Sequence, residues 1–277
     1  MDRIDVKTQF VENGFIKPFP LLSPSACNRV IRDARVSAPE ASWLKGLHEF
    51  DSACTRAALT PALVTLVSEL LGDDVILWAT QVIDQNHGVR HRWHSDAEAM
   101  TWPTVDVWIG LRNVGSNSFL SAIERSHRWG VAPQEFTPTL DLLDDEAVRR
   151  AALTLDPGSS RRDFPMEVGE ALVFDGRLWH ASQTPGPERR TALLLQYSPA
   201  SAAPRVLKHA GSPPEWEQHR PGCLLVAGDG STLNPSNRLI SQRRLRRHHP
   251  WRQFRRLARR IASGLYRSAF QPGWRNR

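Results

Sequence analysis

The sequence predicts a mixed α+β protein with a mainly β core, a double-stranded β-helix of the jelly-roll or cupin-like type, backed by N-terminal helices. Two observations carry this prediction. Helix signals dominate the first 72 residues, and short apolar segments separated by Gly, Pro, Asn and Ser clusters dominate the chain after them. Many short strands that follow early helices are typical of a jelly roll backed by helices. With 277 residues and 40% hydrophobic residues, the chain can bury a sizeable core, which excludes wholesale disorder.

Two early helices carry clear boundary signals. Ser23-Pro24 has the form of an N-cap followed by proline at the first helical position, and predicts a helix toward Arg35. Thr60-Pro61 repeats that signal, and Gly72 marks the end of a helix over 62–71. In this second helix four apolar residues share one face and should pack on a sheet: Leu63, Leu66, Val67 and Leu70.

The segments after Gly72 are predicted as strands, because they are apolar or alternate and are bounded by turn residues. They are Asp74–Asp84, Thr104–Asn113, Phe119–Ile123, Ala171–Phe174, Thr191–Tyr197 and Cys223–Ala227. Two segments interrupt them. Leu140–Leu153, acidic at its start and basic near its end, is predicted as a helical insertion, and Gly158–Asp163 as a mobile loop.

The charge distribution divides the chain into two parts. Residues 238–277 hold 13 of the 36 Lys and Arg residues and no Asp or Glu, which leaves 23 basic against 29 acidic residues in 1–237. We therefore predict a main domain over 1–237 and a basic appendage over 238–277, partly helical from Pro250 onward. The appendage would contact an anionic membrane surface or an acidic partner, bind nucleic acid nonspecifically, or form a solvated extension. Specific nucleic-acid recognition is not expected.

Composition also indicates the cellular setting. Three cysteines far apart in the chain argue against a disulfide framework, and no apolar run approaches the roughly 18 residues of a membrane-spanning helix. The N-terminal residues contain no apolar signal-peptide core. These features predict a cytoplasmic protein, with peripheral membrane association as an option through the appendage.

The first chemical candidate is His94-Ser95-Asp96. An imidazole and a carboxylate two residues apart on a strand point to the same face, so both can reach one metal ion. A further histidine would complete a two-histidine, one-carboxylate triad with open positions for iron. The tripeptide alone is weak evidence, since a strand-end histidine beside a solvated aspartate has the same pattern.

The second candidate lies in residues 169–190. An apolar strand and a turn lead to His180, and Arg190 follows ten residues later at the start of another apolar strand. A guanidinium on a strand beside a metal can hold a carboxylate through paired hydrogen bonds, as a 2-oxoglutarate-type co-substrate requires. Arg189 competes for this role. Strand alternation favours Arg190, because it is in phase with the apolar Ala192 and Leu194.

With these blocks in view, the chain resembles the phytanoyl-CoA dioxygenase family of Fe(II)- and 2-oxoglutarate-dependent oxygenases. The resemblance is carried by Trp93–Asp96, by Leu120–Gly130, and by Gly169–Ser182 with Arg190. In the middle block, Glu124-Arg125-Ser126-His127 stands where the family usually has a Pro-Gly-Ser-His-like turn, so the match there is partial. His127 is expected to brace this turn, and His87 and His91 to lie at the rim of the site.

The resemblance implies a role for each matching residue. His94, Asp96 and His180 would bind iron, and Arg190, assisted by Ser182, would bind the distal carboxylate of 2-oxoglutarate. Trp108 and Gln81 would line the co-substrate pocket. The retained carboxylate of Asp96 argues for hydroxylation, since related halogenases lack it and leave room for halide.

The sequence therefore predicts a dioxygenase that uses Fe(II), 2-oxoglutarate and O2 to hydroxylate a small-molecule or lipid/acyl substrate. Desaturation, cyclisation and demethylation remain open, because they differ only in how the substrate is placed. The alternative is a non-catalytic jelly-roll protein that binds an anionic surface through its basic appendage. No residue names the substrate or the oligomeric state.

Overall fold

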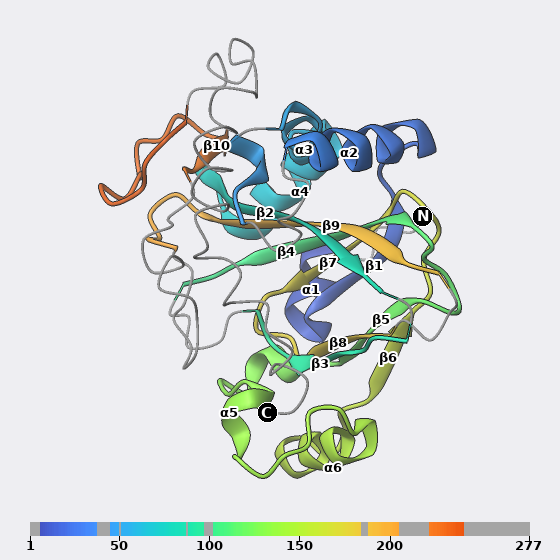
Figure 1. Cartoon of the computed structure of the whole chain (residues 1–277). Coiled ribbons are helices and arrows are strands. Elements are labelled where there is room, and N and C mark those ends of the chain that lie inside the picture. Colours follow the sequence, from blue (N-terminus) through green and yellow to red (C-terminus); the bar gives the residue numbers. More distant parts are fainter. Residues whose placement is uncertain are drawn as a thin grey trace, which may run out of the picture.

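Two antiparallel sheets face each other in the computed structural model, which describes residues 6–37, 45–49, 51–86, 88–96, 102–183, 188–204 and 222–240 (Figure 1). The larger sheet has the strand order β1-β7-β4-β9-β2-β10, and the smaller sheet has the order β3-β8-β5-β6. Neighbouring strands in each order pair antiparallel. Two facing antiparallel sheets with these crossovers form the predicted jelly roll, which confirms the fold class.

The strands and helices have the following bounds. The strands are β1 (Phe15–Pro20), β2 (Val75–Gln85), β3 (His91–His94), β4 (Val105–Arg112), β5 (Phe119–Ile123), β6 (Arg161–Phe164), β7 (Glu170–Asp175), β8 (His180–Gln183), β9 (Arg190–Pro199) and β10 (Leu224–Ala227). The helices are α1 (Val6–Asn13), α2 (Pro24–Ser37), η1 (Leu47–Glu49), α3 (Ser52–Ala58), α4 (Pro61–Leu71), η2 (Ser126–Arg128), α5 (Pro133–Phe136) and α6 (Asp145–Leu155).

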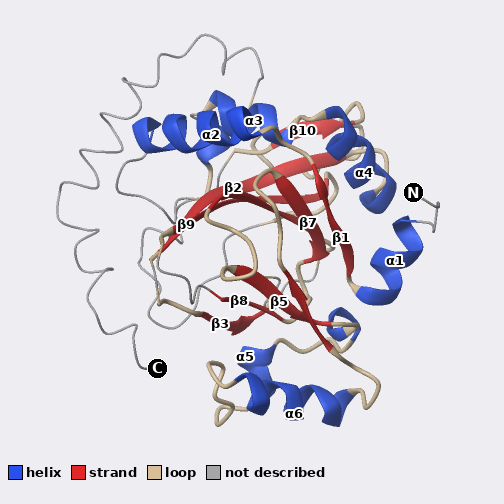
Figure 2. Cartoon of the chain, turned by 90° about the vertical axis from the view of Figure 1, so that its right-hand side faces the viewer, coloured by secondary structure: helices blue, strands red, loops and turns tan. Residues whose placement is uncertain are grey.

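Helices cover the outer face of each sheet. α2, α3 and α4 lie over the six-stranded sheet, while α5 and α6 lie beyond the four-stranded sheet on the opposite side of the molecule (Figures 1 and 2). In α4, Leu63 and Val67 are fully buried, and Leu66 and Leu70 pack beside them as the apolar stripe predicted. Burying such a side chain stabilises the fold by about 1.5–3 kcal/mol, which is what fixes these helices on the sheet.

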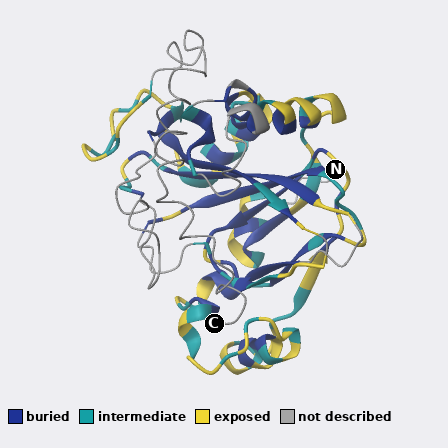
Figure 3. Ribbon diagram, viewed as in Figure 1, coloured by how far each residue is buried: buried dark blue, intermediate teal, exposed yellow. Residues whose placement is uncertain are grey.

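The space between the sheets is lined by every second residue of the strands. On β9, Ala192 and Leu194 pack in the core between the sheets, whereas Leu193 and Leu195 pack in the core under the helices. This alternation makes the six-stranded sheet buried on both faces, as Figure 3 shows for its central strands. An inward polar side chain on these strands is therefore enclosed, and the site is built from such side chains.

Two predicted segments differ from the structure. The mobile loop predicted over 158–163 is wrong for its last residues, because β6 begins at Arg161 and pairs with Ile123 of β5. Charged residues concealed this strand, and an edge strand tolerates such charges. The predicted helix over 140–153 begins later, at Asp145, because the Asp144 side chain accepts hydrogen bonds from the backbone N–H groups of Glu146 and Ala147.

The predicted basic appendage lies almost wholly outside the described residues. At its start, the Arg238 guanidinium is 2.9 Å from Glu49, and Leu239 forms an isolated bridge with Cys223. The domain boundary and the role of the appendage stay predictions. Among the described residues, no helix is both long enough and apolar enough to cross a bilayer.

Candidate metal and co-substrate site

The structure brings together the three predicted metal ligands. His94 is the last residue of β3, Asp96 follows two residues later, and His180 opens β8 directly opposite His94. The two imidazole rings have centroids 4.1 Å apart. The candidate donor atoms of all three residues lie within 4.8 Å of one another, so a single ion can reach all of them.

Hydrogen bonds fix which nitrogen of each histidine faces the centre of this cluster. His94 Nδ1 lies 2.9 Å from the Arg92 carbonyl, and His180 Nδ1 lies 3.0 Å from the Leu178 carbonyl. A carbonyl oxygen only accepts, so each Nδ1 carries the proton and each Nε2 keeps its lone pair. The two Nε2 atoms face Asp96, at 3.5 Å for His94 and 4.0 Å for His180.

Burial sets the protonation states that metal binding requires. Desolvation, with the neighbouring His94, lowers the pKa of His180 to about 4, so this imidazole is neutral near pH 7. Burial raises the pKa of Asp96, but its contacts with His94 and His180 outweigh that effect, and the net pKa is well below the usual range. The cluster therefore offers a neutral imidazole of His180 and the carboxylate of Asp96, beside the Nε2 lone pair of His94.

A second carboxyl group, which the sequence analysis missed, lies behind Asp96. Asp106 of β4 is fully buried; burial and then the Asp96 charge raise its pKa well above the ordinary value. As an acid, Asp106 donates a hydrogen bond to Asp96, while it accepts one from Thr104 Oγ1 at 3.0 Å and one from Gln196 Nε2 at 3.2 Å. Lys45 Nζ in turn donates to Gln196 Oε1 at 3.0 Å. This chain of contacts orients the Asp96 carboxylate.

Arg190 lies in a second enclosed cluster, on the six-stranded sheet that faces the metal ligands. It opens β9 opposite Gln85, the last residue of β2, and only 1% of it is exposed. Its guanidinium donates to Gln85 Oε1 and to Ser182 Oγ, the latter at 2.9 Å, and lies 5.2 Å from the Trp108 ring centroid. Burial lowers the pKa of Arg190 to about 10, which leaves it charged at neutral pH. A buried cation with hydroxyl and amide neighbours can bind a carboxylate.

Three of the four predicted pocket residues lie together, and Gln81 lies elsewhere on β2. Arg190, Ser182 and Trp108 are in direct contact, whereas Arg189 is half-exposed and 3.2 Å from Asp84. Gln81 is buried on the same strand face as Gln85 but opposite Leu194, and its place in the pocket stays a prediction. Gln85 was not among the residues predicted from the sequence. Its position four residues after Gln81, with the same strand parity, was the available signal.

The remaining histidines lie near the cluster or brace the fold. The ring of His91 has its centroid 4.3 Å from that of His94, and burial, together with the charges of His94 and His180, lowers its pKa well below 6.5. His87 lies outside the described residues. His127 Nε2 is 3.1 Å from the Val11 carbonyl, a contact that braces its turn as predicted. In that turn Arg125 takes φ 67°, the left-handed conformation that glycine favours.

The fold and these two clusters define a class of protein: a jelly-roll enzyme with a candidate mononuclear metal centre of two histidines and one aspartate. A family model described as "Phytanoyl-CoA dioxygenase (PhyH)" matches residues 10–192. The chain belongs to this family, as its sequence blocks indicated. Membership confirms an enzyme of the 2-oxoglutarate-dependent oxygenase superfamily, with iron and 2-oxoglutarate as cofactor and co-substrate.

Several solved structures share the fold. A non-heme monooxygenase, ThoJ, in its apo form has a TM-score of 0.62 and 20% identity, covering 95% of this chain and 98% of that one. The α-ketoglutarate-dependent epimerase SnoN from nogalamycin biosynthesis has a TM-score of 0.61 and 17% identity, covering 86% and 93%. CytC3 with Fe(II) and α-ketoglutarate has a TM-score of 0.57 and 18% identity, covering 86% and 92%. No curated protein matches the sequence.

Proposed function

We propose that this chain is a hydroxylase in which His94, Asp96 and His180 bind Fe(II) and Arg190 binds 2-oxoglutarate. Ser182, Trp108 and Gln81 complete the co-substrate pocket, joined by Gln85. The substrate is a small molecule or a lipid or acyl group. The observation that carries the proposal is the convergence of the three donor atoms within 4.8 Å on the four-stranded sheet, with the buried Arg190 of the facing sheet hydrogen-bonded to Ser182 of the same strand as His180.

The donor set fits iron. Two imidazole nitrogens and one carboxylate on one side of an ion leave positions open for a co-substrate and O2. Both histidines have the Nε2 lone pair available, since their Nδ1 atoms are held by backbone carbonyls. When bound there, Fe(II) supplies the oxidative chemistry, in which 2-oxoglutarate is converted to succinate and CO2 while the substrate is oxidised.

The protein's own part is to bind and to exclude water. The Arg190 guanidinium presents a fork of N–H donors to the distal carboxylate of 2-oxoglutarate, and the Ser182 hydroxyl offers one more donor. The guanidinium carbon lies over the Trp108 ring, and this cation–π contact helps to hold the group in place. Because Arg190 and Ser182 are buried, their contacts with a carboxylate act in a medium that weakens charges less than water does.

Hydroxylation is favoured by Asp96. A third protein ligand occupies the position that halide would need, so the site favours insertion of oxygen over halogenation. The solved structures with similar folds include a monooxygenase and an epimerase. They support a small-molecule substrate over a lipid or acyl group, and they leave epimerisation as the alternative reaction. A role for the basic appendage at a membrane or on an acidic partner stays a prediction.

Anaerobic spectroscopy tests the proposal. Adding Fe(II) and then 2-oxoglutarate should produce a visible metal-to-ligand charge-transfer band in the unaltered chain, and His180→Ala and Asp96→Ala should abolish it. His91→Phe, which keeps a ring beside His94, should retain the band. A folded, unaltered chain without the band would refute the site and favour a non-catalytic binding protein. Product analysis with candidate substrates then separates hydroxylation from epimerisation.

A further inference from the structure

The outer face of the four-stranded sheet is covered by residues 129–155, the segment that contains α5 and α6. Trp93 and Trp179, which directly precede His94 and His180, are completely buried in the core beneath this segment. Consecutive strand residues point to opposite faces, so each ligand histidine faces inward while its neighbouring indole faces outward. The covering segment therefore contacts both ligand-bearing strands directly behind the candidate metal centre.

Both indoles are also hydrogen-bonded to this covering segment. Trp179 Nε1 donates to the Val131 carbonyl at 2.7 Å, and Trp93 Nε1 donates to Asp145 at 2.9 Å. The backbone N–H of Trp93 donates to the Leu142 carbonyl at 2.9 Å. Hydrogen bonds to a buried indole are geometrically specific, because the ring has one donor and little room to move.

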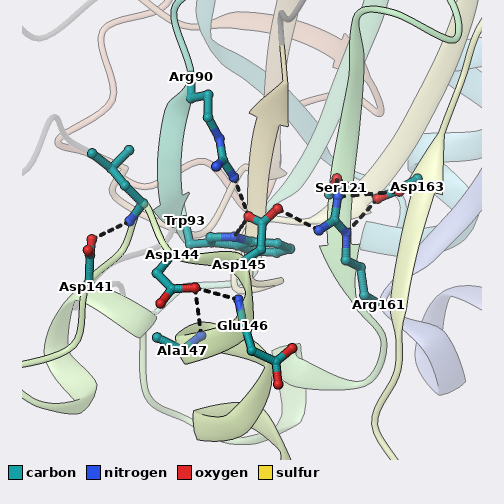
Figure 4. A network of polar contacts seen from close by, with 11 residues as sticks. Arg90, Trp93, Ser121, Asp141, Asp144, Asp145, Glu146, Ala147, Arg161 and Asp163 are labelled. Atoms are coloured by element: carbon teal, nitrogen blue, oxygen red, sulfur yellow. Dashed lines mark hydrogen bonds and ion pairs between the residues drawn. The ribbon is translucent and has the colours of Figure 1, made fainter.

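Asp145 holds this arrangement at the start of α6. Figure 4 shows its carboxylate between Arg90 and Arg161, with the Trp93 indole N–H directed at the same oxygen as Arg90. Arg161 Nη1 lies 2.7 Å from Asp145, and its Nε lies 2.8 Å from Asp163 on β6. The covering segment is thus bonded to strands at both edges of the small sheet, β3 and β6.

The most direct contact with the metal-ligand segment is made by Gln134 of α5. Its side-chain carbonyl accepts a hydrogen bond from Ser95 N at 3.1 Å, and its amide nitrogen donates to Ser95 O at 3.1 Å. Ser95 is buried and separates His94 from Asp96. A bond to each side of one residue fixes its backbone, and this backbone sets the distance and angle between the two ligand side chains.

We propose that Gln134 is a positioning residue of the metal centre. It touches neither the metal nor the substrate, and it acts by holding the backbone of Ser95 so that His94 Nε2 and the Asp96 carboxylate converge. The inference rests on the proposed iron site. Loss of an outer partner of a metal ligand typically weakens metal affinity by about 10- to 100-fold, and we expect a loss in this range.

Metal binding by the full chain tests this inference, with Co2+ as the probe. Gln134→Met keeps the length and volume of the side chain but removes both hydrogen bonds to Ser95, and Gln134→Ala removes the side chain. Both variants should bind Co2+ about 10- to 100-fold more weakly, with a shifted visible spectrum. Thr139→Val, an equally conservative change on the same covering segment, should bind Co2+ as the unaltered chain does.

Two further measurements separate positioning from simple stabilisation. The melting temperature of the metal-free chain should change by no more than a few degrees in Gln134→Met, while the Co2+ dissociation constant rises. An unchanged dissociation constant in both Gln134 variants, whatever their melting temperatures, would overturn the inference and leave the iron site intact. Failure of the unaltered, folded chain to bind Co2+ would overturn the iron site and this inference with it.

Discussion

Replacing Arg190 by alanine is the perturbation that most directly separates the two arginines at the start of β9. Arg190 is buried against Ser182, Gln85 and Trp108, whereas the side chain of Arg189 is 53% exposed beside Asp84. If Arg190 anchors the distal carboxylate of 2-oxoglutarate, Arg190→Ala should weaken co-substrate binding strongly and Arg189→Ala should leave it nearly unchanged.

The magnitude follows from burial. Truncating one partner of a buried, hydrogen-bonded charge pair costs about 2–5 kcal/mol, and 3 kcal/mol corresponds to a dissociation constant roughly 150-fold higher. Arg190→Lys keeps the charge but loses the planar fork, so we expect about 10-fold. Exposed ion pairs contribute about 0–1 kcal/mol, which is why Arg189→Ala should change the constant by less than about 5-fold.

The assay is an anaerobic titration of the Fe(II)-loaded chain with 2-oxoglutarate, followed through the charge-transfer band. The intensity at saturation reports metal occupancy and should be equal in all variants, so the midpoint reports the carboxylate contact alone. A normal midpoint in Arg190→Ala, or a larger shift in Arg189→Ala than in Arg190→Ala, would refute the reasoning.

Three further predictions concern stability and can be checked by urea unfolding. Asp74→Asn should lower the free energy of unfolding at pH 6, because backbone amides hold the folded pKa of Asp74 at about 2. The difference in unfolding free energy from the unaltered chain should shrink as the pH falls from about 4 through 2, and Asp73→Asn is the control. Gly169→Ala should cost more than about 3 kcal/mol, since a Cβ there would lie 2.0 Å from a backbone oxygen at φ +93°, whereas Gly130→Ala, with open space at φ +68°, should cost about 1 kcal/mol. Arg125→Gly should leave stability within about 1 kcal/mol, because relief of the left-handed backbone offsets the lost ion pair, and a large loss would contradict this balance.

The long elements of this fold could be predicted because their signals are local. The predicted strands over 104–113 and 191–197 correspond to β4 and β9, and the helix over 62–71 differs from α4 by one residue at its start. β6 could not be found in this way. Its Arg-Arg-Asp sequence is typical of a loop, and the strand forms by pairing with β5 along its whole length. Glu124, directly after β5, adds an ion pair with Arg162 at 2.7 Å. Such a contact depends on register between distant segments.

The residues of the candidate site likewise fall into those that could be predicted from local sequence and those that were not predicted. His94, Asp96 and His180 could be named from spacing and resemblance, since each of their blocks is contiguous in sequence. Gln85, Asp106 and Gln134 were not named, because their roles arise from strand pairing and from the folding of α5 back onto β3. The only signal for Asp106 in the sequence was its position within an apolar strand. That signal indicates no role until the fold shows that Asp96 lies beside it.

The two halves of the site depend on different parts of the fold. The candidate metal ligands are on β3 and β8 and in the turn after β3, and they are held from outside by the segment over 129–155. Arg190 and its neighbours Gln85 and Trp108 belong to the six-stranded sheet, which α2–α4 support. Substitutions behind β3 should therefore change metal affinity more than co-substrate affinity at saturating metal, and substitutions at Gln85 should do the reverse. Ser182 is the exception, because it lies two residues from His180 on β8 and donates to Gln85 on β2. It is the one side chain among the predicted site residues that ties the co-substrate anchor to the metal-bearing sheet.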